Sequence, residues 1–155
     1  MLSACPEAVI ARLSLVLGFP VTRGNSFFAG LQAKLSSGQE VPCPVDEVRT
    51  PVDVITLSEC VLELAGSGLS GIFHIGATDH IGRYDLTRKL ARRMGFDESL
   101  AVPVTSEKSA SGRAPRHKNG IISVSKAQRM LKTKLLTVDE GIDRAFRERI
   151  SPGEV

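Results

Sequence analysis

The stretch Val54-Ile-Thr-Leu-Ser-Glu-Cys-Val-Leu-Glu-Leu-Ala-Gly66-Ser-Gly-Leu-Ser-Gly71-Ile-Phe-His-Ile75 decides the fold class of this chain. Thr56 and Glu59 have the spacing of a helix capping box, and apolar residues follow at helical intervals. Residues 71–75 are a short apolar run of the kind that forms a buried strand. The stretch therefore predicts a helix, a glycine turn and a strand, in that order.

The glycines of this stretch match the letters of the dinucleotide-binding motif Gly-x-Gly-x-x-Gly. That motif follows a strand and opens a helix, whose first amides hold the pyrophosphate. Here the order is reversed, because a helix precedes the glycines and a strand follows them. We interpret them as a turn, and we expect this chain alone to bind no cofactor.

The rest of the chain continues the alternation of strands and helices. Together the segments predict an α/β class with some α+β character, a small sheet and several helices. Polar residues dominate 104–120, which predicts an exposed loop able to fold over a ligand. Further strands are expected at 8–17 and 121–124, and a loop with a short edge strand at 39–51. Further helices are expected at 25–37, capped by Asn25, at 86–94, ending at Gly95, at 126–131, and after the capping box of Thr137 and Glu140.

Composition limits the class of protein. With 155 residues, 42% of them hydrophobic and 24% charged, we expect one globular domain at 1–150 and a disordered tail at 151–155. The net charge of +3 is spread among acidic residues, which argues against nucleic acid as a partner. No apolar run reaches the roughly 18 residues that span a membrane, so we expect a cytoplasmic protein.

No self-sufficient active site is visible in the sequence. Short-chain dehydrogenases move a proton through a Tyr-x-x-x-Lys pair, in which the lysine lowers the pKa of the tyrosine. The only tyrosine is Tyr84, and Arg88 stands four residues later. The three histidines and three cysteines lack the spacing of metal ligands. We therefore assign no catalytic residue and no metal site, and expect His74, within an apolar strand, to be structural.

Five stretches in order carry a resemblance to a known family. They are Ala11-Arg-Leu-Ser-Leu-Val-Leu-Gly18, Asn25-Ser-Phe27-Phe28, Asp46-Glu-Val-Arg49-Thr-Pro51-Val-Asp-Val, Gly71-Ile-Phe-His-Ile-Gly76 with Arg83-Tyr-Asp-Leu, and Arg113-Ala-Pro115-Arg-His-Lys-Asn119 with Ser125-Lys126. This order resembles the C-terminal substrate-binding half of dTDP-4-dehydrorhamnose reductases, which are extended short-chain dehydrogenases/reductases. The resemblance implies part of an NAD(P)-binding Rossmann-like fold whose N-terminal half, with the cofactor loop and the catalytic tyrosine, is not in this sequence.

The resemblance also implies a substrate site. Arg49, Arg113 and Arg116 would approach a diphosphate, because guanidinium groups suit bidentate contact with phosphate oxygens. Asn25 and Asn119 would bond to sugar or base edges, and Phe27 or its neighbour Phe28 would form an apolar wall. The alternative is that Arg113 and Arg116 belong only to a solvent-exposed loop without a ligand, and that Arg83, Arg88 and Arg92 form a solvated helix face.

Two functions follow as expectations. The first is the nucleotide-sugar-binding portion of an NAD(P)-dependent reductase or epimerase, not catalytic on its own. Its partners would be a nucleotide sugar and either a Rossmann-half polypeptide or a partner enzyme, with NAD(P)H bound only in the full-length family. The alternative is a non-catalytic interaction module resembling the regulatory subunit of methionine adenosyltransferase. Whether the complete protein is an oxidoreductase stays open at this point.

Overall fold

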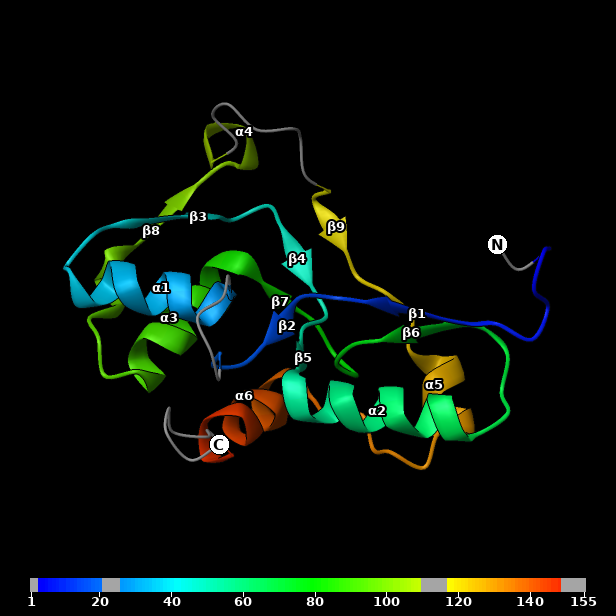
Figure 1. Cartoon of the computed structure of the whole chain (residues 1–155). Coiled ribbons are helices and arrows are strands. Elements are labelled where there is room, and N and C mark those ends of the chain that lie inside the picture. The colour runs from blue at the N-terminus through cyan, green and yellow to red at the C-terminus, as the bar shows by residue number, and fades with distance from the viewer. Residues whose placement is uncertain (1–2, 21–25, 110–116, 149–155) are drawn as a thin grey trace.

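The computed structural model describes residues 3–20, 26–109 and 117–148, in which strands and helices alternate (Figure 1). The strands are β1 (Val9–Leu13), β2 (Val16–Leu17), β3 (Val41–Pro44), β4 (Val48–Arg49), β5 (Val52–Asp53), β6 (Gly71–Ile75), β7 (Ile81–Gly82), β8 (Ala101–Val104) and β9 (Asn119–Gly120). The helices are α1 (Phe27–Ser36), α2 (Val54–Gly66), α3 (Arg83–Arg93), α4 (Ser106–Ser109), α5 (Ser125–Met130) and α6 (Val138–Arg147), with a short 3₁₀ helix η1 (Glu98–Leu100). The predicted α/β class with small sheets and several helices is confirmed.

The strands form four small sheets in the described part of the chain. Three are parallel pairs, β1 with β6, β2 with β5, and β3 with β8. In the fourth sheet β4 lies between β7, which is antiparallel to it, and β9, which is parallel. The longest ladder joins β1 to β6 from the pair Val9 and Gly71 to the pair Leu13 and Ile75.

Two hydrophobic cores lie side by side. The first packs α1, α3 and α6 around β2, and its buried residues are Leu17, Phe28, Leu31, Leu35, Ala77, Leu86, Leu90, Ala91, Val138, Ile142 and Ala145. The second packs α2 and α5 against β6, and its buried residues are Val52, Cys60, Leu64, Phe73, Ile75, Val124, Ala127, Leu131 and Leu135. Figure 1 shows α6 lying between the helices of the two cores.

Arg144 on α6 ties the two cores together. Its guanidinium donates to both carboxylate oxygens of Glu59 on α2, at 2.8 and 2.5 Å, and to Oγ1 of Thr56 at 3.1 Å. A bidentate pair of this kind fixes orientation as well as distance. Glu59 also raises the pKa of Arg144 and has its own pKa lowered, which keeps both groups charged at any physiological pH.

Two helices begin at residues other than those the sequence predicts. Ser26 caps α1, since its Oγ accepts a hydrogen bond from Ala29 N at 2.9 Å. The predicted cap at Asn25, which lies outside the described residues, is therefore wrong. Asp53 caps α2 by accepting from Thr56 N at 2.8 Å. The predicted cap at Thr56 is wrong because Asp53, a better N-cap than threonine, starts the helix three residues earlier.

Three predictions about strands are corrected. The run 8–17 forms two strands that pair with different partners, not one. Residues 121–124 form no strand, and instead Ile122 and Val124 place their side chains in the second core. The proline-rich segment 39–51 holds two short strands, β3 and β4. Prolines are tolerated in β3 because β8 is the one strand that pairs with it among the residues that the structure describes.

The glycine run between α2 and β6 is a turn, as predicted. The helix ends at Gly66, and β6 begins at Gly71. Gly68 and Gly71 have φ angles of +66° and +91°, which side chains disfavour. No helix starts at these glycines, so they have no N-terminal amides to offer a pyrophosphate.

Two other helix boundaries are confirmed. The capping box at the start of α6 is complete, because Glu140 N donates to Thr137 Oγ1 and Thr137 N donates to Glu140 Oε2. Helix α3 ends beside Gly95, whose φ of +80° is the left-handed conformation of a helix stop. The tail at 151–155 lies outside the described residues.

Candidate functional site

An apolar cavity of about 340 Å³ lies where the end of β2 meets the start of α1. Gly18 permits the start of α2 to approach the cavity closely, because a Cβ there would lie 2.7 Å from Val54 Cγ1. Most of the lining is apolar, which suits a planar or hydrophobic part of a ligand. The lining residues are Leu15, Val16, Gly18, Phe19, Pro20, Ser26, Phe27 and Val54.

The structure separates the two phenylalanines that the sequence offers as an apolar wall. Phe27 is the first residue of α1 and lines the cavity. Phe28 is fully buried in the first core, where its ring meets Phe19 with centroids 5.1 Å apart. Of the two rings, Phe27 is thus the one that a ligand in the cavity would touch, and the Phe28 ring lies in the core with its centroid 6.4 Å from that of Phe27.

Arg83, at the start of α3, joins this cavity to the predicted diphosphate strand. Its guanidinium carbon lies 4.5 Å from the centroid of the Phe27 ring, a cation–π distance. Its backbone N–H donates to the carbonyl oxygen of Glu47 at 2.9 Å. The expectation that Arg83 belongs to a solvated helix face is therefore wrong. Sequence reasoning missed it because its partner is remote in the chain.

Arg49 lies on β4, and hydrogen bonds within the chain fix the orientation of its guanidinium. Its Nη2 donates to Glu47 Oε2 at 2.8 Å, and its Nη1 donates to the carbonyls of Val48 and Lys118 at 2.7 and 3.2 Å. Gly120 on β9 makes room for it, because a Cβ there would lie 2.7 Å from Arg49 Cδ. The side chain is 17% exposed, so any phosphate would meet an arginine whose orientation is already fixed.

Asn119 lies on β9, next to the strand that carries Arg49. Val48 and Asn119 form a register pair between β4 and β9. The Asn119 side chain is exposed, and its Oδ1 accepts a hydrogen bond from Ile121 N at 3.0 Å. Arg49 itself is in register with Gly120, so β4 and β9 place Arg49 and Asn119 on neighbouring strands but direct their side chains to opposite faces of the sheet. Arg83 links the Arg49 strand to Phe27.

Asp46 fastens both ends of the segment that contains the other predicted arginines. One carboxylate oxygen accepts from Ser106 N at 2.8 Å, and the other pairs with Lys118 Nζ at 2.9 Å. Residues 110–116, with Arg113 and Arg116, lie outside the described residues. Their predicted contact with a diphosphate, like that of Asn25, stays a prediction.

Asp46 also predicts a pH dependence of stability. Hydrogen bonds from Ser106 and Lys118 hold the pKa of Asp46 well below its usual range. A carboxyl group with a lowered folded pKa stabilises the fold above its unfolded pKa, near 4, and loses this effect as the pH falls through the folded value. Melting curves at pH 7 to 2 should show Asp46→Asn melting below wild type at pH 7, with the difference shrinking below about pH 4. A pH-independent difference would contradict this role.

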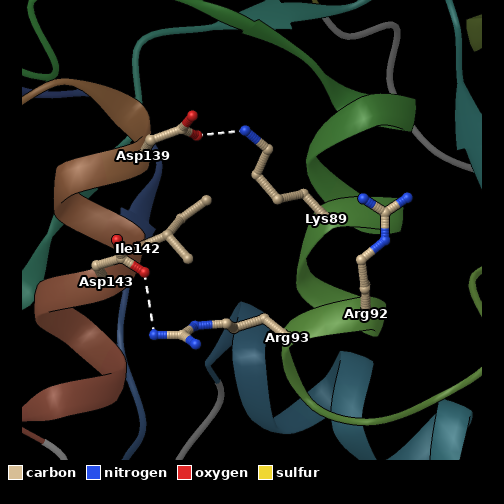
Figure 2. Close-up of a pocket in the computed structure, with 6 residues that line it drawn as sticks. All are labelled: Lys89, Arg92, Arg93, Asp139, Ile142 and Asp143. Atoms are coloured by element: carbon tan, nitrogen blue, oxygen red, sulfur yellow. Dashed lines mark hydrogen bonds and ion pairs between the residues drawn. The ribbon is translucent and has the colours of Figure 1, made fainter.

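The basic face of α3 is directed at carboxylates. A groove of about 460 Å³ lies between α3 and α6. Figure 2 shows Lys89 paired with Asp139 and Arg93 paired with Asp143 across it. The second pair spans 3.0 Å. Arg92, with a side chain 71% exposed, pairs with a glutamate of η1 at 2.7 Å. These pairs compensate the positive charges, so we assign no ligand to this groove.

The described residues hold no group of three His, Cys, Asp or Glu side chains that would bind a metal ion. His74 Nδ1 lies 3.3 Å from the carbonyl oxygen of Ser123, which agrees with its predicted structural role. Tyr84 is half-buried beneath the guanidinium of Arg88, 5.6 Å from its ring centroid. Burial is the main cause that raises the pKa of Cys60 to about 11. Helices in the described ranges are all too short or too polar to cross a membrane.

The chain is an α/β protein of small parallel strand pairs covered by helices, a fold that it shares with part of a solved dTDP-4-dehydrorhamnose reductase and part of a dTDP-glucose 4,6-dehydratase. The chain belongs to the RmlD substrate binding domain family, which matches residues 1–150. The resemblance seen in the sequence is confirmed by this match.

Two curated relatives differ in kind. The chain is 31% identical over 100 residues to the probable low-salt glycan biosynthesis reductase Agl14 of Haloferax volcanii. This match covers 61% of this chain and 32% of that protein. Over 135 residues the chain is 26% identical to methionine adenosyltransferase 2 subunit beta of Danio rerio, covering 83% of this chain and 41% of that protein. The chain thus spans less than half of either relative.

Solved structures share the fold at low identity. The dTDP-4-dehydrorhamnose reductase of Clostridium acetobutylicum gives a TM-score of 0.77 at 21% identity, over 92% of this chain and 49% of that one. The dTDP-4-dehydrorhamnose reductase of Bacillus anthracis in complex with NADP gives a TM-score of 0.73 at 20% identity, over 90% of this chain and 48% of that one. DesIV of Streptomyces venezuelae, a dTDP-glucose 4,6-dehydratase with NAD bound, gives a TM-score of 0.69 at 21% identity, over 91% of this chain and 43% of that one.

Proposed function

We propose that this chain binds a nucleotide sugar, of the dTDP-4-dehydrorhamnose type, as the substrate-binding portion of a cytoplasmic NAD(P)-dependent reductase or epimerase. The observation that carries the proposal is a series of contacts from Phe27 to Arg49. The Arg83 guanidinium lies over the Phe27 ring, and the Arg83 backbone N–H donates to the Glu47 carbonyl. The Glu47 carboxylate in turn accepts from Arg49. This series joins an apolar cavity to a strand with a fixed arginine. A nucleotide sugar needs both, because its base or sugar ring buries apolar surface and its diphosphate needs cations.

Each site residue has a role in this proposal. Phe27 forms the wall against which a ring packs. Arg49, with Arg113 and Arg116 from the segment fastened by Asp46, holds the diphosphate. Asn25 and Asn119 are proposed to bond to the sugar or the base. None of these residues transfers a proton or a hydride, so the chain is not catalytic on its own.

The nicotinamide cofactor belongs to another part of the complete fold. The glycine run in this chain is a turn between α2 and β6, and it has no helix start with which to hold a pyrophosphate. This turn therefore offers no pyrophosphate site, and we propose that the chain alone binds no NAD(P)H. Hydride chemistry would come from a nicotinamide that a Rossmann half holds against the sugar.

Isothermal titration of the purified chain with dTDP, dTDP-rhamnose and NADPH tests the proposal. We expect the two dTDP ligands to bind and NADPH not to bind. The variants Phe27→Ala and Arg113→Ala should each weaken dTDP-rhamnose binding by roughly tenfold, a loss of about 1.4 kcal/mol. Arg92→Ala is the matched control, because this arginine is exposed and pairs with Glu98, and its affinity should not change.

Two results would refute the site. A folded wild-type chain that binds neither dTDP ligand would refute nucleotide-sugar binding by this portion. Binding that Phe27→Ala leaves unchanged would place the ligand away from the cavity. Circular dichroism of each variant confirms that it is folded before titration.

A second candidate function has one observation in its favour. The match to methionine adenosyltransferase 2 subunit beta extends over 83% of the chain, more than the match to the Haloferax reductase. The corresponding proposal is a non-catalytic module that contacts a partner enzyme. A chain that binds a methionine adenosyltransferase catalytic subunit and no nucleotide sugar would favour it over the first proposal.

A further inference from the structure

The connection between α5 and α6, residues 131–137, holds a carboxylate through its own backbone. Lys132 N donates to Glu63 Oε1 at 2.6 Å, and Thr133 N donates to Glu63 Oε2 at 2.8 Å. Thr133 Oγ1 donates to the same Oε2 at 2.7 Å. Successive backbone N–H groups that converge on one anion form a nest, an arrangement that proteins use to bind anions. We call these three donors the 132–133 nest.

Contacts on both sides of the nest hold its shape. Leu131 and Leu135 are buried in the second core. The carbonyl oxygen of Leu136 accepts a hydrogen bond from Thr78 N at 3.0 Å. Because none of these contacts involves Glu63, we expect the nest to keep its shape without that side chain.

The charges around the nest favour an anion. Residues 117–138 include five lysines and arginines and no aspartate or glutamate, so a carboxylate must come from another segment or from solution. Lys132 and Lys134, with Thr133 between them, line a cavity of about 520 Å³. Hydrogen bonds from the Lys132 backbone and from Thr133 are the main causes that lower the pKa of Glu63, and the charge of Lys132 lowers it further. The nest therefore favours the charged form of a carboxylate.

Helix α2 does not depend on Glu63 alone for its position. Glu59, one helical turn earlier, forms the bidentate pair with Arg144 of α6. Cys60 and Leu64, on the inner face of α2, are buried in the second core. Loss of the Glu63 side chain should therefore empty the nest and leave α2 in place.

We infer that the 132–133 nest is a carboxylate-binding site, for which Glu63 is the internal ligand and a small carboxylate from solution is an external one. The two ligands compete, because each presents its oxygens to the same donors. The site is separate from the apolar cavity of the proposed function. Glu63 lies near the end of α2, roughly 13 Å along the helix axis from Val54, the first residue of α2, which lines that cavity. An external carboxylate that displaces Glu63 releases this end of α2 from the α5–α6 connection.

Titration of the Glu63→Ala variant with sodium acetate tests the site. Acetate supplies the CH₂–COO⁻ part of the side chain that the substitution removes. The backbone amide signals of Lys132 and Thr133 are followed by NMR, with the ionic strength held constant by sodium chloride. We expect both signals to shift along a saturable curve. The variant should melt about 4 °C below wild type in chloride, and its melting temperature should rise with the acetate concentration.

Three comparisons separate the nest from other anion sites. In wild type the internal carboxylate competes at a high effective concentration, so acetate should bind at least tenfold more weakly than to Glu63→Ala. Glu63→Gln keeps the side-chain volume and fills the nest, so acetate should not shift the two signals. Adding Thr133→Val to Glu63→Ala removes the hydroxyl donor and should weaken acetate binding by roughly tenfold.

Glu107→Ala is the matched control for loss of a carboxylate. Its side chain is 83% exposed and lies 3.8 Å from Lys118 Nζ. Since this carboxylate receives no hydrogen bonds from a nest, acetate should change the melting temperature of Glu107→Ala no more than that of wild type.

Three results would overturn the inference. Acetate that leaves the Lys132 and Thr133 signals of a folded Glu63→Ala chain unchanged would show that the donors form no site. Equal affinities of wild type and Glu63→Ala would place the anion elsewhere, on the lysine side chains. Affinity that Thr133→Val leaves unchanged would also exclude the nest. If Glu63→Ala is unfolded in chloride, folding in acetate would support the site, and failure to fold in acetate would refute it.

Discussion

Replacing Phe28 with alanine is expected to lower the free energy of unfolding by about 4 kcal/mol, because the large-to-small change leaves a cavity in a core that cannot collapse around it. Phe28 is fully buried, and its ring contacts those of Phe19 and Phe146 at centroid distances of 5.1 and 5.8 Å. Urea unfolding followed by circular dichroism measures the loss. Because Phe19 and Phe27 line the apolar cavity, the variant should also bind dTDP-rhamnose more weakly.

Two substitutions serve as controls for Phe28→Ala. Phe28→Leu keeps most of the buried volume and should cost about 1 kcal/mol. Leu62→Ala removes a side chain that is 73% exposed, so it should change stability by less than about 0.5 kcal/mol. A loss below about 1 kcal/mol for Phe28→Ala would contradict the packing of α1 described above.

The helices with strong patterns could be predicted from the sequence, but not every residue at which they begin. Thr56 and Glu59 have capping-box spacing, yet both contact Arg144, which is 85 residues beyond Glu59. Asp53 takes the cap instead. Spacing alone cannot decide between two acceptable caps, because the choice depends on a helix that is remote in the chain.

The short strands could not be predicted, for a related reason. β4, β5, β7 and β9 have two residues each, which is too few for a hydrophobic period. Their positions depend on partners that are distant in sequence, such as β9 beside β4. The apolar run at 121–124 shows that an apolar pattern can also occur without a strand, because its side chains pack into the second core while its backbone joins no sheet.

The candidate site could be predicted in part. Resemblance pointed to Phe27, and the structure places it in a cavity wall. Charge pattern alone put Arg83 on a solvated helix face, although its guanidinium lies against Phe27. The buried acid beside Arg49 also has no sequence signal, because Glu47 looks like any other charged loop residue. Contacts between remote side chains decide these roles, and a single sequence does not record them.

Replacing Glu47 with glutamine is expected to lower the free energy of unfolding by about 3 kcal/mol, because it removes the buried carboxylate that pairs with the partly buried guanidinium of Arg49. Glu47 is 2% exposed, and its Oε2 lies 2.8 Å from Nη2 of Arg49. Urea unfolding measures the loss. Glu107→Gln is the matched control, since its pair with Lys118 spans 3.8 Å and its side chain is 83% exposed, so the change should be below about 0.5 kcal/mol.

The same variant also distinguishes the two roles of Arg49. If Arg49 binds the diphosphate, removing the competing carboxylate frees a donor, and dTDP should bind Glu47→Gln at least as tightly as wild type although the fold is weaker. If Arg49 only ties β4 to β9, affinity and stability should fall together. In a double-mutant cycle, Glu47→Leu with Arg49→Met should lose less stability than the sum of the single variants, because the pair is then replaced by apolar groups. Additive losses would show that the two side chains do not interact.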